Sequence, residues 1–291
     1  MNLEPITEGS QFITVPAVEP DRLTILLWLW RDSNYSIQYK PEHANTAARM
    51  IHRNLTIPHR FVLLTDQLDA DYDPLITPVK LWDDWRELVN TAWGKDRPQC
   101  YVRLKAFSEE AEEILGKRFV SIDLDCLVVK NIDSLFTRPE DFVIFRRPRK
   151  RQKDRDMVYQ GSMWMMNAGA RAQVWKDFKG EESIAAAQEF IGSDQAWMRH
   201  ILGPNEAGWD GEKDGVYGWY WEQRDSHWRK GPLPNARIIF FNTTRKPWDF
   251  DKDPGHPTCG QCGAPVTVEE PYSLVFNKSL GSHGWIRKFY H

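Results

Sequence analysis

Two carboxylates one residue apart, Asp123 and Asp125, interrupt an otherwise apolar run over residues 119–129. Such a run predicts a buried strand. Ionised carboxylates are costly to bury unpaired, so we expect both where the strand emerges at the carboxyl edge of a sheet, facing a cation or a ligand. Because residues i and i+2 of a strand share one face, both carboxylates can converge on one point. Mn²⁺ or Mg²⁺, together with a diphosphate, fits oxygen ligands at that point. The alternative is a pair of exposed aspartates at a strand end.

The first third of the chain predicts the sheet that must hold these aspartates. Residues 23–30 form a nearly continuous apolar run, typical of a central strand covered on both faces. Pro41 opens a helical pattern that extends to Leu55, and residues 61–66 form a second apolar run. Strand, helix and strand make a right-handed βαβ unit. We therefore expect an α/β fold with a mostly parallel central sheet and helices on both faces.

The rest of the chain continues to alternate between strand and helix patterns. Strands are expected at residues 76–81, 142–145, 163–166 and 238–241, and helices at 98–116, 131–136, 170–178, 182–191 and 194–201. Asp194 is placed as the N-cap of its helix. Residues 203–234 predict a loop with aromatic cover, and residues 242–248 predict an edge loop whose Arg245 and Lys246 are suited to a phosphate.

Composition describes an ordinary soluble globular protein. The chain has 291 residues, of which 41% are hydrophobic and 27% charged, and a net charge of -3, which gives no general attraction to nucleic acid. Residues 1–21 lack the basic and apolar regions of a signal peptide, and no apolar run is long enough to span a bilayer, so a cytoplasmic protein without a transmembrane segment is expected. We expect a leader at 1–22, one domain at 23–250, and an extension at 251–291 packed on that domain.

Four motifs in this order and at these separations resemble the GT-A nucleotide-sugar glycosyltransferases, most closely family eight, the glycogenin and bacterial galactosyltransferase kind. The motifs are Asp123-Leu124-Asp125, Asn167-Ala168-Gly169, Asp194-Gln195 and Lys246-Pro247-Trp248. The resemblance covers residues 23–248. It implies a single Rossmann-like GT-A domain with a C-terminal wrap, and a metal-assisted, retaining transfer of a sugar from a nucleoside-diphosphate sugar to an acceptor. A UDP-sugar is the first candidate for the donor, and a glycan, a lipid-linked molecule or a protein is expected as acceptor, without nucleic acid.

The same resemblance implies roles for individual residues. Asp123 and Asp125 match the aspartates that hold manganese and the donor. Asp194 and Gln195 match the pair beneath the transferred sugar, where they would stabilise its positive charge. Lys105 matches a basic residue near the donor. Asn167 matches a residue that lines the sugar pocket, and Lys246 matches the lysine that contacts the diphosphate.

Two departures from the family pattern concern the metal and the phosphate. The family histidine that completes the metal shell is replaced by Phe240, and a family glycine is replaced by Thr243. Phenylalanine cannot bind a metal. Either the third ligand is Asp249, His256 or His283, or metal binding is weak.

Two further patterns have open interpretations. Seven of the ten residues 146–155 are Arg or Lys, which predicts either a solvated loop or a patch that holds an anionic acceptor. His256, Cys259 and Cys262 offer half of a zinc site, or belong to a surface loop.

Two other functions compete with sugar transfer. A sugar-nucleotide or glycan-binding protein on an inactive transferase fold would be consistent with Phe240. A haloacid-dehalogenase-type phosphatase also places Asp-x-Asp after an apolar strand, but its motif lies near the N-terminus and needs Thr or Val where this chain has Leu127.

Overall fold

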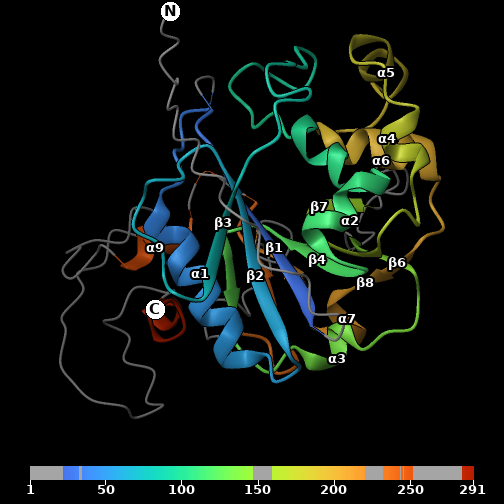
Figure 1. Cartoon of the computed structure of the whole chain (residues 1–291). Coiled ribbons are helices and arrows are strands. Elements are labelled where there is room, and N and C mark those ends of the chain that lie inside the picture. Colours follow the sequence, from blue (N-terminus) through green and yellow to red (C-terminus); the bar gives the residue numbers. More distant parts are fainter. Residues whose placement is uncertain are drawn as a thin grey trace, which may run out of the picture.

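A seven-stranded sheet forms the centre of the computed structural model, which describes residues 22–32, 35–146, 159–219, 232–242, 244, 246–251 and 284–291. Its strand order is β3-β2-β1-β4-β7-β6-β8 (Figure 1). The strands are β1 (Leu23–Leu29), β2 (His59–Thr65), β3 (Ile76–Lys80), β4 (Arg118–Ile122), β6 (Phe142–Arg146), β7 (Tyr159–Asn167) and β8 (Ala207–Trp209).

The sheet is mostly parallel. β1 pairs in parallel with both β2 and β4, and β3 pairs in parallel with β2. β7 is antiparallel to both of its neighbours, β4 and β6, so it runs against the direction of the others. The predicted α/β fold and the βαβ unit of β1, α1 (Pro41–Asn54) and β2 are confirmed.

The predicted single strand over residues 119–129 is wrong. The chain leaves the main sheet after Ile122 and enters a second sheet as β5 (Cys126–Val128). There β5 pairs with β10 (Ile238–Phe240), which also pairs with β9 (Val216–Gly218). The break falls at Asp123-Leu124-Asp125, so both aspartates lie in the connection between the sheets and not on one strand face.

The two faces of the main sheet have separate apolar layers. Ile25, Leu27 and Leu29 of β1 point to the layer that holds α1 and the second sheet. Leu26 and Trp28 point to the opposite layer, which holds η1 (Tyr101–Phe107), α2 (Glu112–Leu115), α4 (Gln173–Lys176) and α6 (Asp194–Leu202). Figure 1 shows α2, α4 and α6 gathered away from α1. This alternation is the expected pattern for a strand buried on both faces.

Several predicted elements are shorter or differently built. The helix expected at 98–116 consists of η1, η2 (Glu109–Ala111) and α2, and those expected at 170–178 and 182–191 are reduced to α4 and α5 (Glu181–Ala186). The loop predicted at 203–234 contains β8, α7 (Gly211–Asp214) and β9 among its described residues. The short α3 (Asp133–Phe136) is present as expected. Asp194 is the first residue of α6 and not its N-cap, which is Ser193.

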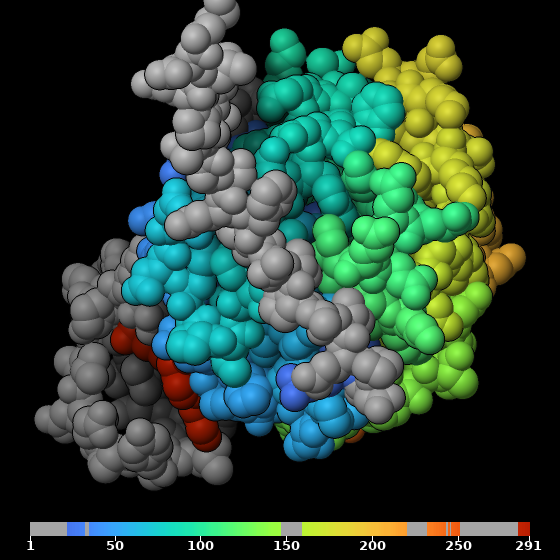
Figure 2. All heavy atoms as spheres, in the orientation of Figure 1, coloured from blue at the N-terminus to red at the C-terminus, as the bar shows by residue number. Residues whose placement is uncertain are grey.

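The last eight residues pack against the main body. Ile286 and Tyr290 of the C-terminal segment are buried, and Arg287 Nε donates to Phe250 O in α9 (Pro247–Asp251) at 2.6 Å. Figure 2 shows these residues, in red, beside the blue N-terminal part of the chain. Three predicted features lie outside the described residues: the leader up to residue 21, residues 147–155 of the basic run, and the trio His256, Cys259 and Cys262. In the part of the chain that the structure describes, no helix has the length and apolar character needed to cross a bilayer.

Candidate functional site

A cavity of about 340 Å³ opens at the carboxyl ends of β1 and β4. Its walls come from segments far apart in the sequence: the end of β1 and the loop after it, residues 93–103, the turn after β4, the start of β7, the start of α6, and the residues that follow β10. In parallel α/β sheets this edge is the usual place for ligands. Five of the seven predicted site residues line this cavity: Asp123, Asp125, Asp194, Gln195 and Lys246.

Asp125 is held by two donors that act on the same oxygen. Lys246 Nζ lies 2.6 Å from Asp125 Oδ2, and the hydroxyl of Tyr39 donates to this oxygen at 2.9 Å. The side chains of Asp125 and Lys246 are 8% and 4% exposed, so this is a buried ion pair. Lys246 Nζ also donates to Phe241 O at 2.9 Å, and the backbone of Phe241 donates to Asp125 O at 2.8 Å. The turn after β4 and the end of β10 are therefore fastened together at Asp125.

Arg103 joins Asp123 to Asp194. Its Nη1 donates to Asp123 Oδ1 at 2.9 Å, and its Nε lies 3.3 Å from Asp194 Oδ2. Arg103 Nη2 also donates to Gly161 O at the start of β7, and the guanidinium lies over the ring of Trp28, 5.7 Å from its centre. The side chains of Arg103 and Asp194 are each 5% exposed. One guanidinium therefore connects the aspartate turn with the start of α6.

Burial and like charges shift the pKa values in this cluster. Burial raises the pKa of Asp123 to about 6; Arg103 opposes the rise, and the carboxylates of Asp125 and Asp194 add to it. Burial also raises the pKa of Asp194, against the effect of Arg103. Burial disfavours the ammonium of Lys246, but its interactions with Asp125, Tyr35 and Asp123 together more than offset this, so the pKa of Lys246 is raised. Three carboxylates thus face two cations, and the cluster retains an affinity for one more positive charge.

Gln195 lies beside Asp194, and its side chain is fixed by two hydrogen bonds to the backbone. Its Nε2 donates to Ile191 O at 2.9 Å, and its Oε1 accepts from Gly161 N at 3.0 Å. Gly192 has φ +125°, and a Cβ there would lie 2.5 Å from Gln195 Cγ, so this turn requires glycine. The chain therefore presents Asp194 and Gln195 to the cavity from a tightly shaped turn.

Two predicted site residues lie elsewhere. Asn167 is at the far end of β7, where its Oδ1 accepts from Arg118 Nη1 at 2.6 Å at the start of β4. Lys105 faces away from the cavity lining and pairs with Asp84 at 2.7 Å. Neither residue lies where the resemblance had placed it.

The antiparallel direction of β7 explains why Asn167 is distant. Its first residues, Gln160 to Ser162, lie next to the end of β4 and line the cavity, whereas its last residue reaches the opposite edge of the sheet. The backbone of Asp123 donates to Ser162 O at 2.9 Å. Sequence reasoning missed these residues, and also Arg103 and Tyr39. Arg103 lies two positions before Lys105 on the same short segment, so only the turn geometry of η1 decides which of the two side chains reaches the cavity. Tyr39 has no motif around it.

The two aspartates fit a hard divalent cation. Such a cation is typically bound by one or two carboxylates, retained waters and substrate phosphates, and the unbalanced carboxylate charge of the cluster favours it. Among the described residues no three or more His, Cys, Asp and Glu side chains are gathered so that they could hold a metal ion by themselves. Phe240 is fully buried against Phe145, and Asp249 Oδ2 accepts from Lys246 N at 2.8 Å at the start of α9. His256 and His283 lie outside the described residues.

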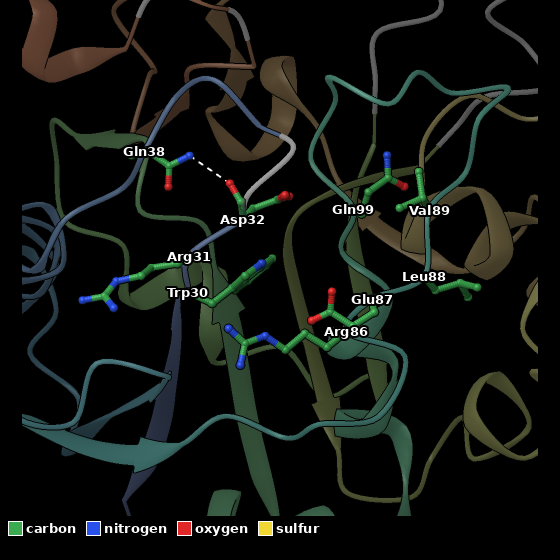
Figure 3. Close-up of a pocket in the computed structure, with 9 residues that line it drawn as sticks. All are labelled: Trp30, Arg31, Asp32, Gln38, Arg86, Glu87, Leu88, Val89 and Gln99. Carbon is green, nitrogen blue, oxygen red and sulfur yellow. Dashed lines mark hydrogen bonds between the residues drawn. The ribbon is translucent and has the colours of Figure 1, made fainter.

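A second cavity of about 240 Å³ adjoins the first and shares Trp30, Asp32 and Gln38 with it. Figure 3 shows residues after β1 on one side and residues 86–89 on the other, with the Arg31 side chain pointing away from them. Arg86 pairs with Asp66, whose carboxylate also accepts from the backbone of Arg31 at 3.2 Å. The second cavity therefore extends the site along the ends of β1 and β2.

No protein-family model matches the sequence, and no curated protein matches it. Solved structures that resemble this chain include three glycosyltransferases. The galactosyltransferase LgtC, in complex with donor and acceptor sugar analogues, is 13% identical with a TM-score of 0.47, over 78% of this chain and 89% of LgtC. GlyE of Streptococcus pneumoniae TIGR4 is 10% identical with a TM-score of 0.49, over 78% of this chain and 57% of GlyE. The bifunctional enzyme WbbM is 12% identical with a TM-score of 0.48, over 80% of this chain and 48% of WbbM. The chain thus spans about half the length of GlyE and of WbbM.

Proposed function

We propose that this chain is a glycosyltransferase that moves a sugar from a nucleoside-diphosphate sugar to an acceptor. The observation that supports this most is the convergence, in one cavity, of a basic group for a diphosphate, a carboxylate pair for a cation, and Asp194 with Gln195 at a separate wall. These groups come from the turn after β4, the start of α6 and the segment after β10. Their meeting at the carboxyl edge of a parallel sheet fits a nucleotide ligand.

The leaving group of such a reaction is a nucleoside diphosphate, whose negative charge grows in the transition state. Lys246 would meet that charge, because its ammonium lies at the cavity wall and already carries a raised pKa. A group that binds the developing charge more tightly than the ground state accelerates the reaction. Asp123 and Asp125 would hold Mn²⁺ or Mg²⁺, which when bound supplies further stabilisation of the phosphate oxygens.

Asp194 and Gln195 would act on the sugar. Asp194 is buried, and its carboxylate oxygens lie 3.5 and 3.6 Å from the position of a Cβ on Gly161, so glycine leaves room beside them. A carboxylate at this place stabilises positive charge that develops at the anomeric carbon. We expect retention of the anomeric configuration, with Asp194 as electrostatic stabiliser. The second cavity lies on the β1–β2 side, where the nucleoside of a UDP-sugar would extend.

Release of nucleoside diphosphate from a panel of nucleotide sugars, with Mn²⁺ present, tests this function. Release that increases with one acceptor class, a glycan, a lipid-linked molecule or a protein, is the expected result. Tight binding of a nucleotide sugar without any release would instead favour the inactive binding protein. Release of inorganic phosphate from simple phosphate esters, with nucleotide sugars left intact, would favour the phosphatase.

A further inference from the structure

The carboxylate of Asp125 has two unequal oxygens. Its Oδ2 accepts from both Tyr39 and Lys246, at 2.9 and 2.6 Å. Its Oδ1 accepts no hydrogen bond from the described part of the chain. The carboxylate also lines the cavity. Among the described residues, therefore, one oxygen of Asp125 is fixed by two donors and the other is not engaged.

The two donors on Oδ2 differ in what else they must do. In the proposed function Lys246 meets the diphosphate, which draws its ammonium toward the ligand. Tyr39 has no such second task, so its hydroxyl remains on Oδ2 when a ligand occupies the cavity.

Tyr39 is itself held in place by packing. Its ring meets Trp248 of α9 edge-on, with the ring centres 5.3 Å apart, and Trp248 stacks on His43 of α1 at 3.8 Å. The ammonium of Lys246 lies 5.6 Å from the centre of the Tyr39 ring. Because α1 and α9 clamp this group of rings, the hydroxyl has little freedom to leave Asp125.

We propose that Tyr39 is a positioning residue that orients Asp125, so that Oδ1 is presented to the divalent cation of the donor complex. This inference rests on the proposed function. A hydrogen bond to one oxygen of a metal-binding carboxylate fixes its orientation, and loss of such an outer partner typically lowers metal affinity by about 10- to 100-fold. Tyr39 does not touch the reacting atoms.

The test is the affinity for Mn²⁺, measured by calorimetry with a saturating nucleoside diphosphate, for the parent protein and for Tyr39→Phe. The matched control is Tyr72→Phe, which removes a phenol hydroxyl that donates to Gln67 O at 2.9 Å, outside the cavity. We expect Tyr39→Phe to bind Mn²⁺ about 10- to 100-fold more weakly, and Tyr72→Phe to bind as the parent does. Melting curves for each variant verify that the fold is retained.

The outcomes separate this inference from the proposed function. Metal-dependent nucleotide binding that is the same in the parent and in Tyr39→Phe would overturn the role of Tyr39 and leave the proposed function standing. A parent protein that binds nucleoside diphosphate without any effect of Mn²⁺ would overturn the metal site itself, and with it the inference. Equal weakening in Tyr39→Phe and Tyr72→Phe would show a general loss of structure and would also overturn it.

Discussion

Replacing Arg103 by Met should destabilise the protein strongly, because this one side chain neutralises two carboxylates. Methionine retains much of the apolar length of arginine but carries no charge. Asp194 would then lie buried, with 5% of its side chain exposed and its main cationic neighbour removed, whereas Asp123 keeps partial access to solvent at 26% of its side chain. Most of the loss should therefore come from Asp194.

The expected size follows from buried ion pairs in general. Removing one partner of such a pair costs about 3 to 5 kcal/mol, because the other charge stays buried. Whole domains have a free energy of unfolding of only about 5 to 15 kcal/mol. With a urea dependence of about 3 kcal/mol per molar, the midpoint of unfolding should fall by about 1 to 1.7 M.

Urea unfolding of four proteins tests this reasoning: the parent, Arg103→Met, Asp194→Asn, and the double variant. Asparagine in place of Asp194 removes the uncompensated charge, so the double variant should be more stable than Arg103→Met alone, and the cycle should show coupling. An unchanged midpoint in Arg103→Met would refute the reasoning. The reasoning would also be refuted if Asp194→Asn destabilised Arg103→Met by as much as it destabilises the parent, because the two residues would then not be coupled.

Three further predictions concern other parts of the structure. Lys105→Met should leave the nucleoside-diphosphate affinity measured by calorimetry unchanged, because Lys105 lies outside the cavity lining. It should lower the free energy of unfolding by at most about 1 kcal/mol, because the pair with Asp84 lies near the surface. A loss of affinity would return Lys105 to the site. Burial lowers the pKa of His59, which contacts His52 at 3.0 Å. The unfolded chain therefore binds protons more readily, so melting temperature should be highest above about pH 6.5 and fall below it, with a flatter profile in His59→Gln. Gly161→Ala should melt like the parent, since its methyl would meet Asp194 at an ordinary 3.5 Å, but it should raise the donor Michaelis constant by filling the cavity; parent-like kinetics would place the sugar elsewhere.

The βαβ unit and the overall class of fold could be predicted from the sequence. The apolar run of β1 and the helical period of α1 are local signals, and Pro41 marks the first residue of the helix. The elements with weaker signals were predicted less well. The 98–116 segment has helical periodicity but folds as separate 3₁₀ and α turns, of which η1 packs on α4.

Five of the predicted site residues meet because their motifs lie where strands or helices begin or end, which local pattern reveals. Asn167 and Lys105 lie outside the cavity for different reasons. Asn167 depends on whether β7 runs parallel or antiparallel to β4, which is decided by pairing over 40 residues or more and leaves no local signal. Lys105 and Arg103 carry the same charge on one short segment, so choosing between them requires knowledge of how that segment turns.

Donor turnover tests the central claim most directly. Nucleoside-diphosphate release with Mn²⁺, from the nucleotide sugar that the parent uses, should be compared in the parent, Asp123→Asn and Asn167→Ala. Asp123→Asn keeps the shape of the side chain, and Arg103 keeps its contact with Asp194; Asn167→Ala alters a predicted residue that lies outside the cavity. We predict that Asp123→Asn lowers turnover by about 100-fold or more, while Asn167→Ala turns over like the parent. Release by Asp123→Asn at the parent rate, or no release from any nucleotide sugar by the parent, would contradict the account.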